Sequence, residues 1–121
     1  MANVRRLKSM PIPDASRAVV EDAKVREYLL NLGHPDGGSK ARWFHSLGYN
    51  LENWHDLATD LLIVARECRD FDTETTRFGV KYRAWGAVGC PGYRPGLVMT
   101  VWIVEDDKSP RLVTAYPDDK P

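Results

Sequence analysis

Apolar residues in the first half of the chain recur every three or four positions, which is the spacing of one face of an α-helix. The pattern predicts helices over residues 22–31, 40–47 and 51–68, and glycines after the first two act as stop signals. In the first helix the apolar stripe consists of Val25, Tyr28, Leu29 and Leu32. Residues 1–13 lack this period and contain two prolines, so we expect a flexible arm there and a single domain over residues 14–121.

After Asp70 the period of the apolar positions changes to two, which is typical of β-strands. The pattern predicts strands over residues 71–76, 80–88, 97–105 and 111–116, separated by turns rich in Gly, Pro and Asp. Because these connections are too short for crossover helices, we expect an antiparallel meander. The sequence therefore predicts an α+β domain, in which three N-terminal helices pack on one face of a four-stranded antiparallel meander sheet.

The alternation of side chains along the predicted strands assigns one face of the sheet to the helices and the other to solvent. Strand 97–105 is apolar at every second position, so we expect this set to face the helices: Leu97, Met99, Val101 and Ile103. The opposite, open face then collects residues from three strands: Lys81, Arg83, Trp85, Thr100, Trp102, Thr114 and Tyr116. A slip of one residue in the register would invert any of these assignments.

Charge refines the picture of this open face. Seventeen basic and seventeen acidic side chains give a formal net charge of zero, which disfavours a strongly basic wrapper of nucleic acid. Residues 75–104, however, contain no Asp or Glu, and seven of the twelve aromatic residues follow residue 70. Cations beside flat rings suit single-stranded nucleic acid, so we expect RNA to contact Lys81, Arg83, Trp85, Thr100 and Trp102. The alternative is an ordinary sheet, because strands favour aromatic residues anyway.

Several classes of protein are excluded by composition and spacing. Cys68 and Cys90 are too few for a disulfide scaffold or a four-ligand zinc site, and His34, His45 and His55 lack the spacing of metal ligands. We therefore expect no metal and no cofactor. The basic N-terminus lacks the apolar run of a signal peptide, and no apolar stretch is long enough to span a membrane. The sequence predicts a cytoplasmic protein that is not associated with a membrane.

Metal-free cleavage of RNA needs a proton taken from the 2′-hydroxyl, a proton given to the leaving 5′-oxygen, and neutralisation of the charge on the phosphate. Histidine, lysine, arginine, tyrosine and threonine suit these roles, and the sequence offers each type at His34, Lys40, Arg111, Thr114 and Tyr116. His34 precedes a glycine turn and the helix start that carries Lys40. Thr114 and Tyr116 lie two apart on the last strand, so they point to the same face. As an alternative, these residues have structural roles only. His34 is then a turn residue and Lys40 a solvated side chain, and Thr114 and Tyr116 merely close the sheet.

Motifs along nearly the whole chain, from about Ile12 to Pro117, resemble an uncharacterised family of small bacterial proteins. These motifs are Lys24-x3-Tyr28-Leu-Leu-Asn, His34-Pro-Asp-Gly-Gly-Ser-Lys-Ala41-x2-Phe44-x2-Leu-Gly48, Gly79-Val-Lys-Tyr82, Thr100-Val-Trp-Ile-Val-Glu105 and Arg111-Leu-Val-Thr-Ala-Tyr-Pro117. The layout in turn looks like the barnase/colicin/RelE-type ribonuclease toxin fold, which is an analogy at the level of the fold. The resemblance implies that a basic or histidine residue near the first helices meets polar strand residues over the sheet.

These observations together predict a toxin-like, metal-independent endoribonuclease that cleaves RNA through attack of the 2′-hydroxyl. The expected partners are RNA and a cognate antitoxin or another protein. Two alternatives stay open. One is a non-catalytic interaction module, such as the partner or neutraliser within a toxin–antitoxin pair, which the zero net charge and the acidic third helix fit. The other is an RNA-binding domain without catalysis.

Overall fold

The computed structural model describes residues 11–68 and 70–118, so most of the expected flexible arm lies outside the described residues. Ile12, which belonged to that arm, is 1% exposed and packs in the core. Its backbone N–H donates to the carbonyl of Ala65 at 3.1 Å. The arm therefore does not extend as far as Ile12. This residue lies between two prolines in the sequence, and its apolar side chain packs in the core.

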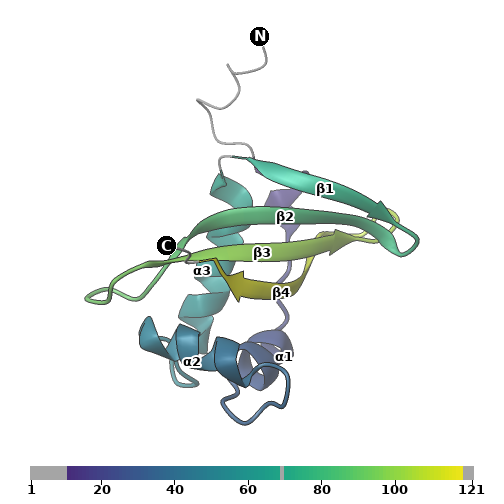
Figure 1. Ribbon diagram of the computed structural model, residues 1–121. Coiled ribbons are helices and arrows are strands. Elements are labelled where there is room, and N and C mark those ends of the chain that lie inside the picture. Colours follow the sequence, from purple (N-terminus) through teal and green to yellow (C-terminus); the bar gives the residue numbers. More distant parts are fainter. Residues whose placement is uncertain (1–10, 69, 119–121) are drawn as a thin grey trace.

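Helical segments precede four strands along the chain, as expected (Figure 1). The helical segments are η2 (Ala15–Arg17), α1 (Asp22–Lys24), η3 (Val25–Leu29), α2 (Gly38–Ser46) and α3 (Trp54–Glu67). The strands are β1 (Phe71–Thr76), β2 (Gly79–Val88), β3 (Gly96–Val104) and β4 (Arg111–Pro117). The predicted helix over residues 22–31 corresponds to α1 and η3, which follow one another directly, and η3 is a π-helix.

The four strands form one sheet in the order β1-β2-β3-β4, and every neighbouring pair is antiparallel. This confirms the predicted meander. A bulge interrupts the last pairing, since Val101 lies opposite Thr114 and Trp102 lies opposite Leu112. The extra residue, Val113, shifts the alternation of β4 by one position. As a result Leu112 and Ala115 both reach the core at 0% exposure.

The predicted packing of three helices on one face is only partly confirmed. Helix α3 lies against the sheet, and its residues Leu57, Leu61 and Ala65 are fully buried. Segments α1, η3 and α2 instead gather beside the edge strand β4, below the sheet in Figure 1. One helix thus covers the face, and the others enclose one edge of the sheet.

The face predicted for strand β3 is wrong. Opposite residues of antiparallel strands share a face, and a Cβ atom on Gly86 would lie 2.9 Å from Val64 of α3, so Gly86 faces the helix. Its partner Val98, and the next residues of that set, Thr100 and Trp102, are 0% exposed. The set expected to face the helices therefore lies on the opposite face: Leu97, Met99, Val101 and Ile103. Val101 and Ile103 are nevertheless buried there, at 7% and 6% exposure.

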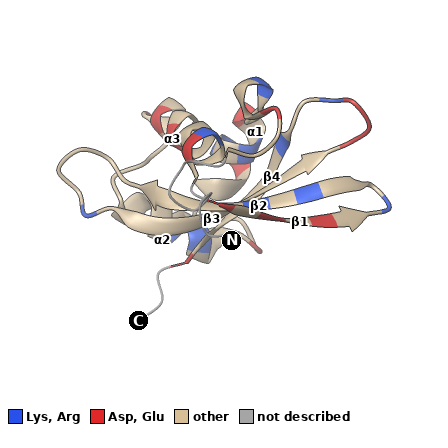
Figure 2. Cartoon of the chain, turned by 90° about the horizontal axis from the view of Figure 1, so that it is seen from above, with Lys and Arg blue, Asp and Glu red and all other residues tan. Residues whose placement is uncertain are grey.

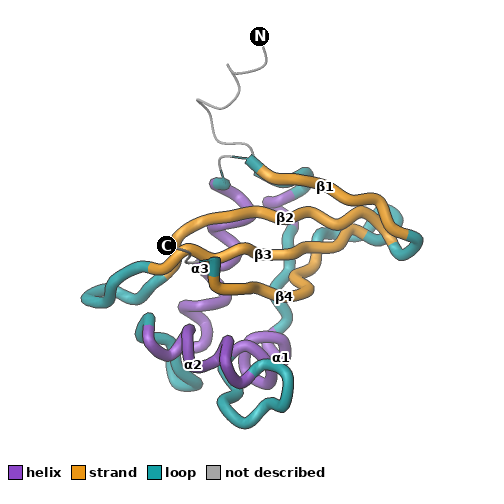
Figure 3. Tube along the Cα trace, viewed as in Figure 1, coloured by secondary structure: helices purple, strands orange, loops and turns teal. Residues whose placement is uncertain are grey.

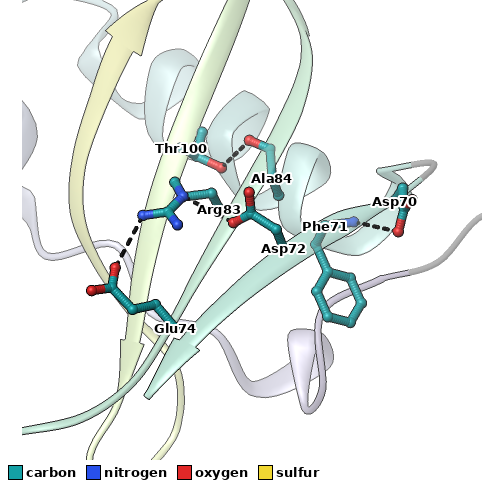
Figure 4. A network of polar contacts seen from close by, with 7 residues as sticks. All are labelled: Asp70, Phe71, Asp72, Glu74, Arg83, Ala84 and Thr100. Carbon is teal, nitrogen blue, oxygen red and sulfur yellow. Dashed lines mark hydrogen bonds and ion pairs between the residues drawn. The ribbon is translucent and has the colours of Figure 1, made fainter. Parts of the chain in front are cut away.

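A relay of two hydrogen bonds explains why polar groups of β3 are buried. Trp102 donates its Nε1–H to Thr100 Oγ1 at 2.8 Å, and Thr100 donates to the carbonyl of Ala84 at 2.8 Å (the second bond is drawn in Figure 4). Both buried donors are satisfied, so burial of the large Trp102 ring carries no penalty for an unpaired polar group. This satisfaction favours the observed face over the predicted one.

We expect Thr100→Val to lower the free energy of unfolding by about 1–3 kcal/mol, because the change leaves the Trp102 Nε1–H buried without an acceptor. Urea denaturation measures this loss. Thr75→Val is the matched control, since Thr75 is exposed on β1, and its effect should stay within about 0.5 kcal/mol. Equal effects of the two substitutions would contradict the role of the relay.

Candidate active site at the edge of the sheet

The loop between η3 and α2 is folded around His34. The ring Nδ1 of His34 accepts the N–H groups of Asp36 and Gly37, each at 3.0 Å, and its carbonyl accepts the N–H of Gly38 at 3.0 Å. A Cβ atom on Gly37 would lie 2.9 Å from Tyr28 Cε1, so glycine lets the loop pack on the tyrosine ring. Figure 3 shows this loop joining the helices beneath the sheet. The loop thereby holds His34 beside η3.

Lys40 joins the helices to the edge strand. Its Nζ donates to the hydroxyl oxygen of Tyr28 at 2.6 Å and to Thr114 Oγ1 at 3.1 Å. The same atom lies 4.9 Å from the ring centroid of Tyr28 and 4.1 Å from that of Tyr116. The ring of His34 meets the Tyr28 ring edge-on, with centroids 4.9 Å apart. Five side chains from η3, the loop, α2 and β4 therefore form one cluster, which we call the Lys40 cluster.

The Lys40 cluster contains a cation without a carboxylate. Among residues 11–68 and 70–118 the ion pairs involve only Arg17, Arg83 and Arg111 as cations. Lys40 is half-buried, and among the described residues its ammonium group contacts hydroxyl groups and aromatic rings. An ammonium group has three donors, and two are used here. The arrangement suits an anion such as a phosphate, which would supply the missing negative charge.

Hydrogen bonds lower the pKa of Tyr28 and select the tautomer of a neutral His34 ring. The hydrogen bond from Lys40 is the largest effect on Tyr28 and holds the pKa of its phenol below the ordinary value of 10.0. Thr114 and Lys24 lower the pKa of Tyr28 further, whereas burial acts in the opposite direction. The Nδ1 of His34 accepts two N–H groups, so the proton of the neutral ring sits on Nε2. The phenol of Tyr28 therefore ionises more readily than an ordinary tyrosine, and the Nε2–H of a neutral His34 ring is available as a hydrogen-bond donor.

A cleft of about 400 Å³ opens beside Tyr28 and His34. The other residues that line it lie in α1 and η3 or directly before α1: Glu21, Ala23, Lys24 and Glu27. Lys24 also lies over the Tyr28 ring, with its Nζ 5.5 Å from the centroid. The cleft gives a ligand access to Tyr28 and His34, and no residue of β4 lines it.

The structure brings together four of the five predicted catalytic residues: His34, Lys40, Thr114 and Tyr116. Arg111 is separate, because its Nη2 pairs with Glu105 Oε1 at 3.1 Å across the turn from β3 to β4. Sequence reasoning missed Tyr28, which it treated as part of the apolar stripe of a helix. The motif Lys24-x3-Tyr28 was the only signal for this tyrosine.

The predicted RNA-binding residues are not brought together on one surface. Thr100 and Trp102 face the core at 0% exposure, so their assignment to the open face is wrong. Lys81, Arg83 and Trp85 do lie on the open face, opposite residues of β3 on that face.

The cations of β2 lie beside carboxylates of β1. Arg83 pairs with Asp72 at 2.9 Å and Glu74 at 3.3 Å (Figure 4), and Lys81 lies opposite Glu74 in the register. Figure 2 shows blue segments of β2 next to red segments of β1. This part of the open face is therefore close to electrically neutral.

Metal ligands and membrane spans are both lacking in the part of the chain that the structure describes. No group of three or more His, Cys, Asp or Glu side chains there is placed to hold a metal ion. None of the described helices has the length and hydropathy needed to cross a bilayer.

We expect the phenol of Tyr28 to titrate at a lower pH than an ordinary tyrosine, and Lys40→Met to move its pKa back towards 10.0. Ultraviolet titration of the protein and of Tyr28→Phe isolates this group. Because the folded chain releases this proton at a lower pH than the unfolded chain, the free energy of unfolding gains a contribution as pH rises from the lowered pKa towards 10. An unchanged titration in Lys40→Met would contradict the assigned cause.

Comparisons with known proteins identify a solved structure with a similar fold and the family of this chain. A chain of a contact-dependent growth inhibition toxin–immunity protein complex from Klebsiella pneumoniae 342 superposes with a TM-score of 0.69. The two chains are 16% identical, and the match covers 88% of this chain and 98% of that chain, so it shows a shared fold. No curated protein matches the sequence. A family model described as "Domain of unknown function (DUF6883)" matches residues 11–119, and the chain belongs to this family.

Proposed function

We propose that the protein is a toxin-like endoribonuclease that cleaves RNA without a metal, through attack of the substrate's own 2′-hydroxyl. The observation that carries the proposal is the Lys40 ammonium group, which Tyr28 and Thr114 hold at the edge of the sheet and which has no carboxylate partner among the described residues. A phosphodiester supplies the negative charge that this position lacks. The cleft beside Tyr28 and His34 provides room for a nucleotide next to that phosphate.

The proposed reaction uses two proton transfers and one exchange of bonds at phosphorus. The phenolate form of Tyr28, which the hydrogen bond from Lys40 favours by lowering the pKa of the phenol, takes the proton of the 2′-hydroxyl. The 2′-oxygen then bonds to phosphorus, and the bond from phosphorus to the 5′-oxygen breaks. Tyr116, whose ring is 40% exposed beside Lys40, gives its proton to the leaving 5′-oxygen. The products are a 2′,3′-cyclic phosphate and a 5′-hydroxyl.

The remaining groups of the cluster stabilise charge. Lys40 neutralises the negative charge that grows on the phosphate oxygens, and Thr114 fixes the position of its Nζ. His34 donates its Nε2–H to the same phosphate, since its Nδ1 is occupied by two backbone N–H groups. Arg111 has no role in this proposal, because it is paired with Glu105.

The fold fits a toxin-like or an immunity-like module, and the proposal takes the first of these. The solved chain with the same fold belongs to a complex of a growth inhibition toxin with its immunity protein. By analogy, we propose that this chain acts on RNA in the cytoplasm and has a cognate neutralising protein as a second partner.

A second candidate function is a non-catalytic interaction module, such as the neutraliser of a toxin. Exposed apolar side chains favour it, since Trp85 is 37% and Leu97 is 51% exposed on the open face. Surfaces of this kind serve as protein interfaces. This candidate predicts tight binding to a protein without any cleavage of RNA.

Cleavage of a labelled RNA tests the first proposal. We expect cleavage to persist in EDTA and to leave 2′,3′-cyclic phosphate ends, and an RNA with 2′-deoxy nucleotides should be inert. Lys40→Ala should lower the rate by about 10²–10³-fold, since it removes a charge-stabilising donor. Tyr28→Phe should lower it by about 10²–10⁴-fold, since it removes the proton acceptor.

Lys108→Ala is the matched control, because Lys108 is exposed in the turn before β4 and should leave the rate unchanged. Circular dichroism checks that each variant is folded. Cleavage that requires a divalent metal, or full activity in both Lys40→Ala and Tyr28→Phe, would overturn the proposal. A folded chain that cleaves no RNA but binds a protein partner would favour the second candidate.

A further inference from the structure

Strand β2 extends beyond the strand beside it. The last pair between β1 and β2 joins Phe71 with Ala84, whereas β2 continues to Val88. On its other side this extension stays paired with β3, from Trp85 opposite Met99 to Val88 opposite Gly96. Within residues 11–68 and 70–118, no backbone hydrogen bond joins residues 85–88 to any segment other than β3. Among the described residues, the extension therefore has no strand partner on this side and presents a short edge of the sheet there.

Apolar side chains flank this edge from both layers of the fold. Helix α3 provides Ile63, which is 41% exposed, and the sheet provides Trp85 at 37% and Leu97 at 51%. Two adjoining hollows of about 170 Å³ and 400 Å³ run along the edge and share Trp85 and Gly86 in their lining. Together they form a groove between α3 and β2, which we call the β2 groove.

The groove has the shape that an added β-strand needs. A strand sends successive side chains to opposite faces of its sheet, and here both faces offer an apolar wall. One wall contains Ile63 and Val64 of α3, and the other contains Trp85 and Leu97 on the open face. Gly86 lets β2 lie close against α3, because a Cβ atom at this position would be 2.9 Å from Val64. An extended peptide would pair with the open edge and pack on both walls.

Charge indicates which kind of peptide fits. Glu67 lines both hollows and Asp70 lines the larger one. Neither carboxylate takes part in an ion pair among the described residues. Two such carboxylates favour a peptide that carries lysine or arginine, and they disfavour a second copy of this chain, which would bring acid against acid.

We propose that the β2 groove is a docking site for an extended segment of another protein, which adds a strand to the edge of β2. The segment alternates apolar residues and carries a basic residue that faces Glu67 and Asp70. This mode gives affinity through backbone hydrogen bonds and specificity through side chains. The groove lies along β2, whereas the Lys40 cluster lies at β4, at the other edge of the sheet. The bound segment therefore leaves the Lys40 cluster open, and the inference does not depend on RNA cleavage.

The probe for this site is a yeast-displayed library of nine-residue peptides in which valine alternates with random residues. Selection on the full chain should enrich peptides with lysine or arginine at a random position. Ile63→Lys should weaken binding of a selected synthetic peptide at least tenfold, because it removes an apolar contact and adds a like charge. Leu51→Lys is the matched control, since Leu51 is 55% exposed before α3. It should bind as the unchanged protein does.

Hydrogen exchange of the unchanged protein gives a second readout. Amides of residues 85–88 that point away from β3 should exchange more slowly when the peptide is bound. Failure to enrich any peptide, equal binding by Ile63→Lys and Leu51→Lys, or no added protection of residues 85–88 would overturn the proposal. Dimerisation of the chain that Ile63→Lys abolishes would identify a second copy as the occupant. A loss of single-stranded RNA binding in Trp85→Ala, with peptide binding intact, would identify the groove as a nucleic-acid surface. Both of these results, dimerisation through the groove and RNA binding by it, would overturn the proposal.

Discussion

The contact of Lys40 with Tyr28 and Thr114 ties three parts of the chain together. Lys40 comes from α2, Tyr28 from the helical stretch before it, and Thr114 from the edge strand β4. The helices that do not cover the face of the sheet are fixed beside its edge by this contact and by apolar packing. The same contact keeps a cation half-buried without a carboxylate, so fold and candidate chemistry depend on one interaction.

The two edges of the sheet differ in what they offer. At the β4 edge, charge and hydroxyl groups converge, and a bulge at Val113 turns Thr114 away from the core. At the β2 edge, backbone that has no strand partner among the described residues lies between apolar walls, with two carboxylates nearby. The first suits a phosphate and the second suits a polypeptide.

Period and turn signals allowed the helices, the strands and the meander to be predicted, because these depend on local sequence. The face of β3 was not predictable by alternation alone, since Val98 and Trp102 are apolar as well as Met99 and Ile103. The hydrogen bonds of Thr100 decide the face, and they depend on a neighbouring strand. The position of Arg111 depends on the bulge, which the pattern does not show. The sequence pattern predicts Tyr28 as a core residue, because its aromatic ring falls on the apolar stripe of a helix and the pattern gives no sign of a role for its hydroxyl group.

The most direct test of the central claim is whether Lys40 meets a phosphate. Lysine side-chain NMR signals of the protein can be followed while a 2′-deoxy-substituted oligonucleotide, which cannot be cleaved, is added. The account predicts that the signals of Lys40 and the Tyr28 ring shift together and saturate at the same concentration, and that Thr114→Val weakens this binding. Shifts confined to other lysines, such as Lys81, with Lys40 unchanged at saturation, would contradict it.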